Sequence, residues 1–111
     1  MQVPEVLYHA TLKENGDSIW DNGIRIGKQG LTYFADSING AAAFLVIHGI
    51  QLEDILVFEI ESSELEVELI DYGADHNVRF FKGIEVYTYP KHINPMCINN
   101  AYELFYQAEE T

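Results

Sequence analysis

Three side chains that could take part in chemistry lie far apart in this sequence: His9, Tyr33 and Glu85. His9 lies in LYHAT, at the end of a short apolar run, and Tyr33 lies in LTYFA. Glu85 lies between Ile84 and Val86, and a carboxylate that is buried among such neighbours needs a partner. Each residue also has an ordinary structural explanation, because aromatic residues are common in strands and strand alternation could turn Glu85 to water.

Two further histidines raise the question of a metal site. His76 in GADHN and His92 in PKHI could act with Asp75 or Glu85. Their spacing matches no helix-borne ligand pair, so a role in loops is favoured and no metal is predicted. Cys97 is the only cysteine, which excludes an internal disulfide and a cysteine metal cluster and favours a reducing compartment.

Composition limits the class of protein. The 111 residues and a hydrophobic fraction of 48% predict one domain, 1–111, with a real core. The formal net charge of −12 argues against a broad basic face that binds nucleic acid, but it leaves room for a pocket for a small anionic ligand or for a basic protein partner. The sequence begins without signal-peptide features and has no bilayer-length apolar run, so we expect a cytoplasmic protein without a membrane partner.

The pattern of apolar and turn residues predicts an α+β domain with mostly antiparallel strands. A first helix is expected over residues 15–22, with Ile19 and Trp20 facing inward and Gly23 at its end. Ser37 is the expected N-cap of a second helix that runs to about Ile47. Strands are expected over residues 6–9, 31–35, 55–60, 65–70, 78–81, 85–89 and 93–98, and the tail from residue 101 fits either strand or helix.

Three motifs together resemble the ADP-ribosyltransferase family, in particular its diphtheria-toxin-like and PARP-like branch. They are LYHAT at Leu7–Thr11, GLTYFADSINGAAAF at Gly30–Phe44 and GIEVYTYPKHINPMCI at Gly83–Ile98, and they follow the family's order over most of the chain. The resemblance implies antiparallel split β-sheets with short flanking helices around an NAD cleft. It also implies an enzyme that cleaves the bond between nicotinamide and ribose and transfers ADP-ribose to a macromolecule.

The resemblance also implies roles for individual residues. Glu85 would bind the ribose 2′-hydroxyl and stabilise the positive charge that develops on the sugar. His9 would bind a hydroxyl of the adenosine ribose, assisted by Thr11, and the backbone of Ala10 would bind the carboxamide of nicotinamide. Tyr33 and Phe44 would hold the nicotinamide ring between them, since a cationic ring is attracted to aromatic faces.

Some positions depart from the family pattern. Ala10 stands where glycine often follows the histidine, Ala41 stands where a helix serine often contacts the carboxamide, and Gly83 removes the Glu-x-Glu signature of arginine-modifying relatives. Two alternatives therefore stay open beside transfer: hydrolysis of NAD by water, and an acidic non-enzymatic inhibitor on the same scaffold. Small size and acidic charge fit a phage or mobile-element protein, with toxin-like action on a basic host factor.

Overall fold

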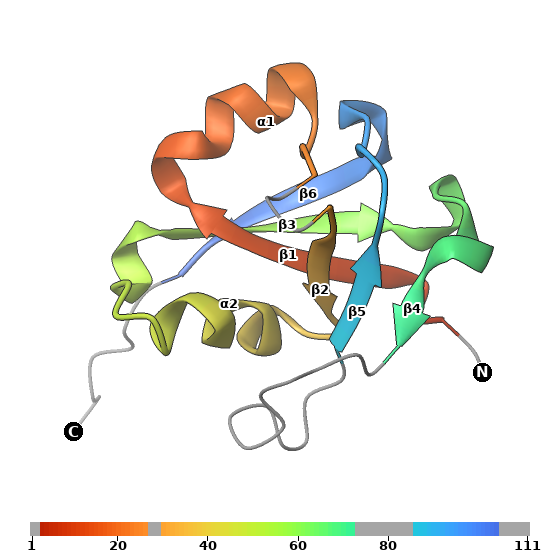
Figure 1. The fold of residues 1–111 in the computed structure, drawn as a ribbon. Helices are drawn as coiled ribbons and strands as arrows, with labels where there is room; N and C mark the ends of the chain where they lie inside the picture. The colour runs from red at the N-terminus through yellow and green to blue at the C-terminus, as the bar shows by residue number, and fades with distance from the viewer. Residues whose placement is uncertain (1–2, 27–29, 73–85, 105–111) are drawn as a thin grey trace.

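An antiparallel sheet of six strands organises the chain in a computed structural model that describes residues 3–26, 30–72 and 86–104 (Figure 1). The strand order is β4-β5-β2-β1-β3-β6, so the first strand of the chain lies inside the sheet. The predicted α+β class with mostly antiparallel strands is confirmed. The strands are β1 (Val6–Leu12), β2 (Thr32–Ala35), β3 (Ile55–Glu61), β4 (Asp71–Tyr72), β5 (Val86–Tyr89) and β6 (Ile98–Glu103).

The sheet consists of two three-stranded halves with a narrow junction. β1 pairs with β3 along its whole length, from Val6 with Glu61 to Leu12 with Ile55. Between β1 and β2, by contrast, the paired residues are Tyr8 and Ala35 alone. Figure 1 shows β2 and β5 running steeply to the direction of β1 and β3. The predicted split is therefore seen only as this divergence, because all six strands belong to one sheet.

Each face of the sheet carries one helix and one hydrophobic core (Figure 1). The first core includes Ile19 of α1 (Gly16–Asn22) with Leu7, Phe34 and Phe58. The second core joins Ala41 and other residues of α2 (Ile38–Val46) to the opposite face. No helix within the described ranges combines the length and the apolar character that a membrane crossing requires.

Both predicted helices are confirmed together with their end signals. The side chain of Ser37 accepts a hydrogen bond from the backbone N–H of Gly40 at 3.0 Å, as an N-cap should. Gly23 ends α1 with φ of 84°, and its N–H donates to the carbonyl of Ile19 at 2.7 Å. A Cβ at Gly23 would lie 2.0 Å from the carbonyl oxygen of Ile93, so this position needs glycine for space as well as for conformation.

Three local predictions are wrong. Residues 65–70 do not form a strand: LEVELI follows the 3₁₀ turn η3 (Ser62–Glu64) and contains the 3₁₀ turn η4 (Val67–Leu69). Residues 93–98 are mostly a bridge at Ile93 and a turn at η5 (Pro95–Cys97), and the strand begins at Ile98. Trp20 is 44% exposed, because the short helix α1 directs Ile19 into the core and leaves Trp20 with one edge-on ring contact, to Phe58 at 5.5 Å. The predicted strand at 78–81 lies outside the described residues.

Candidate functional site

His9 and Tyr33 meet at the point where β1 and β2 diverge. If the register continued from Tyr8 and Ala35, Ala10 would lie opposite Tyr33, but the structure does not pair them. Instead the Nδ1 atom of His9 lies 2.9 Å from the backbone carbonyl oxygen of Tyr33. A carbonyl oxygen can only accept, so Nδ1 carries the proton and donates it. The side chain of His9 thus links the two halves of the sheet where their backbones separate.

This hydrogen bond determines what else the His9 ring can bind. Burial lowers the pKa of His9 below its ordinary value of 6.5, and the hydrogen bond to the Tyr33 carbonyl opposes this shift only in part. The ring is therefore neutral at neutral pH, with Nε2 as an acceptor. Although the ring is densely surrounded and contacts Phe34 edge-on at 5.8 Å, the residue as a whole stays partly exposed. His9 can accordingly accept a hydrogen bond from a hydroxyl group.

Tyr33 and Phe44 form an aromatic pair between β2 and α2. Their ring centroids lie 5.9 Å apart and the ring planes are inclined by 46°. Both residues are partly exposed, whereas Phe34 and Ala35 next to Tyr33 are fully buried. Phe44 is also held at the end of its helix, where the Nδ1 of His48 donates to its carbonyl oxygen at 2.6 Å. The pair thus offers accessible aromatic surface on a fixed backbone.

Ala10 and Thr11 continue β1 beyond the junction. Both are partly exposed, and they pair with Val57 and Leu56 of β3. The hydroxyl oxygen of Thr11 accepts a hydrogen bond from the side-chain amide of Asn15 at 3.1 Å. Ala10 and Thr11 therefore lie one and two positions after His9, on the part of β1 that is not paired with β2.

Glu85 is the predicted site residue that the structure does not place, because it lies outside the described residues. The strand that follows it in sequence, β5, pairs with β2 from Ala35 with Val86 to Thr32 with Tyr89. Asp75 and His76, which entered the possible metal site, also lie outside the described residues. Within the parts of the chain that are described, no group of three potential metal ligands comes together.

The small residues before Phe44 have a packing role. Gly40, Ala41 and Ala42 are buried, and the two alanines pack against Ala35, Ile55 and Val57. Small side chains let a helix approach a sheet closely. Ala41, which stands where the family often has serine, is 1% exposed and belongs to this contact.

Sequence reasoning missed one polar group near the junction. Thr32, the residue before Tyr33, is 3% exposed, and its hydroxyl oxygen has no hydrogen-bond partner among the described residues. Threonine is common in strands, so nothing in the sequence distinguishes an unpartnered hydroxyl from an ordinary one.

Comparison with known proteins identifies no relative: no family model matches the chain, and no curated protein matches it. The ADP-ribosyltransferase resemblance therefore depends on the three motifs and on the arrangement of His9, Tyr33 and Phe44.

Proposed function

We propose that the chain is an NAD-dependent ADP-ribosyltransferase with an ADP-ribosyltransferase-like fold, acting on a macromolecular acceptor with a basic surface. The observation that carries the proposal is the Tyr33–Phe44 ring pair beside the hydrogen bond from His9 to the Tyr33 carbonyl. These residues come from two separate motifs of the sequence, and the resemblance assigns all three to one NAD site.

The ring pair supports the proposal if it can admit a nicotinamide ring. Carbon atoms in contact lie about 3.5–4.0 Å apart, so a ring held between two others separates them by about 7 Å. The observed centroid distance is 5.9 Å and the planes are inclined by 46°. The rings must therefore move apart by about 1 Å and become more parallel when nicotinamide binds. Both side chains are partly exposed.

His9 supports the proposal through its protonation state. Its Nδ1–H is used by the Tyr33 carbonyl, which leaves Nε2 to accept a hydrogen bond from a ribose hydroxyl. A neutral imidazole is the form that can accept, and the lowered pKa of His9 favours that form. Ala10 would offer its backbone to the carboxamide, and Thr11 lies two positions beyond His9.

The chemical step would depend on Glu85. Cleavage of the bond between nicotinamide and ribose places positive charge on the sugar and releases neutral nicotinamide. A carboxylate near the sugar stabilises that charge as it develops, and the acceptor nucleophile then forms the new bond to the ribose carbon. Tyr33 and Phe44 would orient the leaving ring, which is a contribution by positioning.

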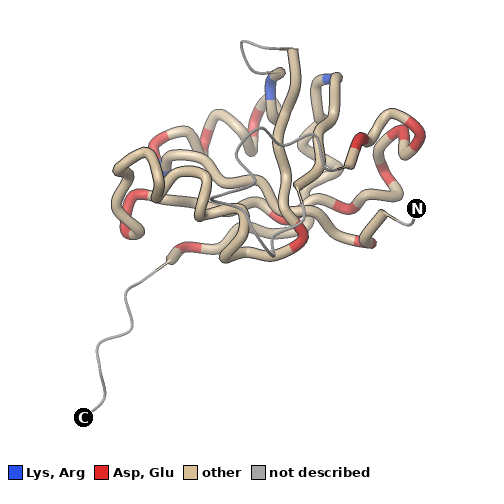
Figure 2. The backbone as a smooth tube through the Cα atoms, turned by 60° about the horizontal axis from the view of Figure 1, so that its bottom comes forward, with Lys and Arg blue, Asp and Glu red and all other residues tan. Residues whose placement is uncertain are grey.

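A second candidate is an acidic inhibitor that keeps the scaffold without catalysis. Two observations favour it: the buried Ala41 cannot supply the hydrogen bond of the family's serine, and the net charge of −12 suits a basic target. Figure 2 shows Asp and Glu spread over much of the described backbone, with few Lys and Arg.

Incubation with labelled NAD and a cell lysate tests these alternatives. We expect label on a macromolecule together with free nicotinamide. Nicotinamide without transferred label would instead indicate an NAD glycohydrolase. The absence of both products and of NAD binding would favour the inhibitor and would rule out the proposed enzyme.

A further inference from the structure

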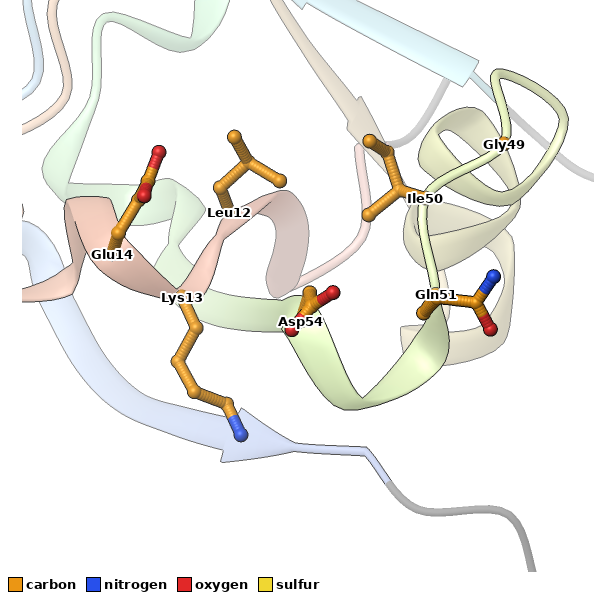
Figure 3. A pocket seen from close by; sticks show the side chains of 7 residues that line it. All are labelled: Leu12, Lys13, Glu14, Gly49, Ile50, Gln51 and Asp54. Carbon is orange, nitrogen blue, oxygen red and sulfur yellow. The ribbon is translucent and has the colours of Figure 1, made fainter.

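A pocket of about 400 Å³ lies at the end of β1 (Figure 3). Its walls come from the turn after β1 and from the loop that joins α2 to η2 (Leu52–Asp54). It shares no lining residue with the Tyr33–Phe44 pair. The lining residues are Leu12, Lys13, Glu14, Gly49, Ile50, Gln51 and Asp54.

The pocket combines an apolar wall on each side with carboxylates. Figure 3 shows Leu12 and Ile50 on opposite sides of the space, with the Asp54 side chain below and between them. Both apolar residues are partly buried, whereas Glu14 and Asp54 are exposed. At Gly49 no heavy atom of the described residues, its chain neighbours aside, lies within 4 Å of the place where a Cβ would be, so these residues leave the rim open there.

The charged residues that line the pocket determine whether it favours a cation or an anion. Lys13 is the only basic residue among the described residues that line it, and its Nζ lies 2.8 Å from Glu103 Oε1 of β6. Figure 3 shows Lys13 directed toward β6 and away from the space between Leu12 and Ile50. The positive charge of Lys13 is therefore balanced by Glu103. Figure 3 shows the Asp54 carboxylate beside this space and Glu14 on the far side of Leu12, so Asp54 is the charge that favours a cation there.

We propose that this pocket binds an arginine or lysine side chain of a partner protein. The aliphatic stem would pack between Leu12 and Ile50, and the charged head would meet Asp54. An anionic ligand would face the same carboxylate and be repelled. A second copy of this chain, which also carries a net charge of −12, is a poorer partner than a basic segment. That this partner is the acceptor of the proposed ADP-ribose transfer rests on the proposed function, whereas the binding of a basic side chain does not.

Titration of the full chain with a blocked tripeptide tests this site, with amide chemical shifts as the readout. The tripeptide has a central arginine, and the same tripeptide with neutral citrulline serves as the ligand control. We expect shifts concentrated at Leu12 and Gly49–Gln51. Asp54→Asn should weaken binding by roughly 2- to 5-fold, the scale of one exposed ion pair. Glu53→Gln is the matched protein control, because Glu53 is an exposed carboxylate of η2 outside the pocket lining and should leave binding unchanged.

Three outcomes would overturn the proposal: equal binding of the citrulline peptide, equal losses in Asp54→Asn and Glu53→Gln, or shifts spread evenly over acidic surfaces. The measurement needs neither NAD nor turnover. A chain that binds the arginine peptide here but never cleaves NAD would keep this site and refute the enzyme. A chain that transfers ADP-ribose but does not bind the peptide here would support the enzyme and refute this binding site.

Discussion

The imidazole Nδ1 of His9 donates a hydrogen bond to the backbone carbonyl of Tyr33 at 2.9 Å, across the junction between the two halves of the sheet. The backbone supplies only the pairing of Tyr8 with Ala35 at this junction. A residue that the motifs assign to ligand binding is thus also part of the structure that positions Tyr33. Substitution of His9 should therefore affect both ligand binding and the stability of the fold, and the two effects need separate measurements.

The first prediction concerns pH and His9. Because the pKa of His9 is lowered in the folded state, the His9 imidazole takes up a proton near pH 6.5 in the unfolded state but stays neutral at that pH in the folded state. The free energy of unfolding should therefore decrease as the pH falls below 6.5 toward the folded-state pKa. His9→Gln keeps a side-chain donor but cannot titrate, so this part of the acid sensitivity should disappear. Denaturant unfolding of both proteins from neutral to mildly acidic pH measures the difference, and parallel curves would show that His9 does not titrate this way.

The second prediction concerns the aromatic pair. Phe44→Ala removes one face of the proposed nicotinamide site, and an aromatic contact of this kind contributes about 0.5–1.5 kcal/mol. NAD should bind roughly 2- to 10-fold more weakly, which calorimetry or the NAD-dependent rise in melting temperature would report. Val46→Ala is the control, because Val46 is on the same helix and is 44% exposed. Equal NAD affinity in Phe44→Ala and the parent would exclude the sandwich.

The third prediction separates catalysis from binding at Glu85. Glu85→Gln keeps the size and an acceptor but removes the charge, so NAD affinity should stay nearly constant. Nicotinamide release should fall by about 10²–10³-fold, the usual loss for one electrostatic contact in the transition state. Glu68→Gln, at an exposed carboxylate of η4, should have parental turnover. Unchanged turnover in Glu85→Gln would remove Glu85 from the mechanism.

The fourth prediction concerns the attachment of the N-terminal segment. The buried hydroxyl of Ser62 lies 2.6 Å from the Pro4 carbonyl oxygen and 3.0 Å from that of Glu5. Ser62→Ala removes the donor and should lower the free energy of unfolding by about 1–2 kcal/mol. Ser63→Ala, at the exposed neighbouring position, should change it by less than about 0.5 kcal/mol. If chemical denaturation gave similar values for both variants, the Ser62 contacts would not contribute to stability.

The fifth prediction concerns the unpartnered hydroxyl of Thr32. Burial of a polar group without a hydrogen bond is unfavourable, and valine has nearly the same shape and suits a strand. Thr32→Val should therefore leave stability unchanged or raise it by up to about 1 kcal/mol, with NAD affinity preserved. A weaker NAD interaction in a stably folded Thr32→Val protein would instead make this hydroxyl a ligand contact.

The parts of the fold that could be predicted have strong local signals. Ser37 before a run of helix formers and Gly49 after it mark α2, and the apolar run at 55–60 marks β3. The arrangement of His9 with Tyr33 followed from the motif resemblance alone, since no local pattern shows that their strands diverge. The backbone pairing that positions them depends on contacts between distant segments.

The errors have equally specific causes. In LEVELI the alternation of apolar and acidic residues satisfies the strand pattern, yet short 3₁₀ turns bury Leu65 and Ile70 just as well. Trp20 is a large apolar residue of a kind often found in cores, but adjacent helix residues point in different directions, so Ile19 faces the core and Trp20 stays 44% exposed. The pocket beside Leu12 has no sequence signal, because its lining joins a turn and a loop about 40 residues apart.

The position of β1 inside the sheet has a consequence for how the chain folds. β1 is synthesised well before β3, but its long ladder joins Val6 to Glu61 and Leu12 to Ile55 of β3. The loop between these segments must close before the ladder can form, and closure of long loops slows folding. We therefore expect folding in the range of about milliseconds to seconds, as for other domains dominated by distant strand pairings. Until β3 has been synthesised, the described residues offer β1 a single strand pair, that of Tyr8 with Ala35.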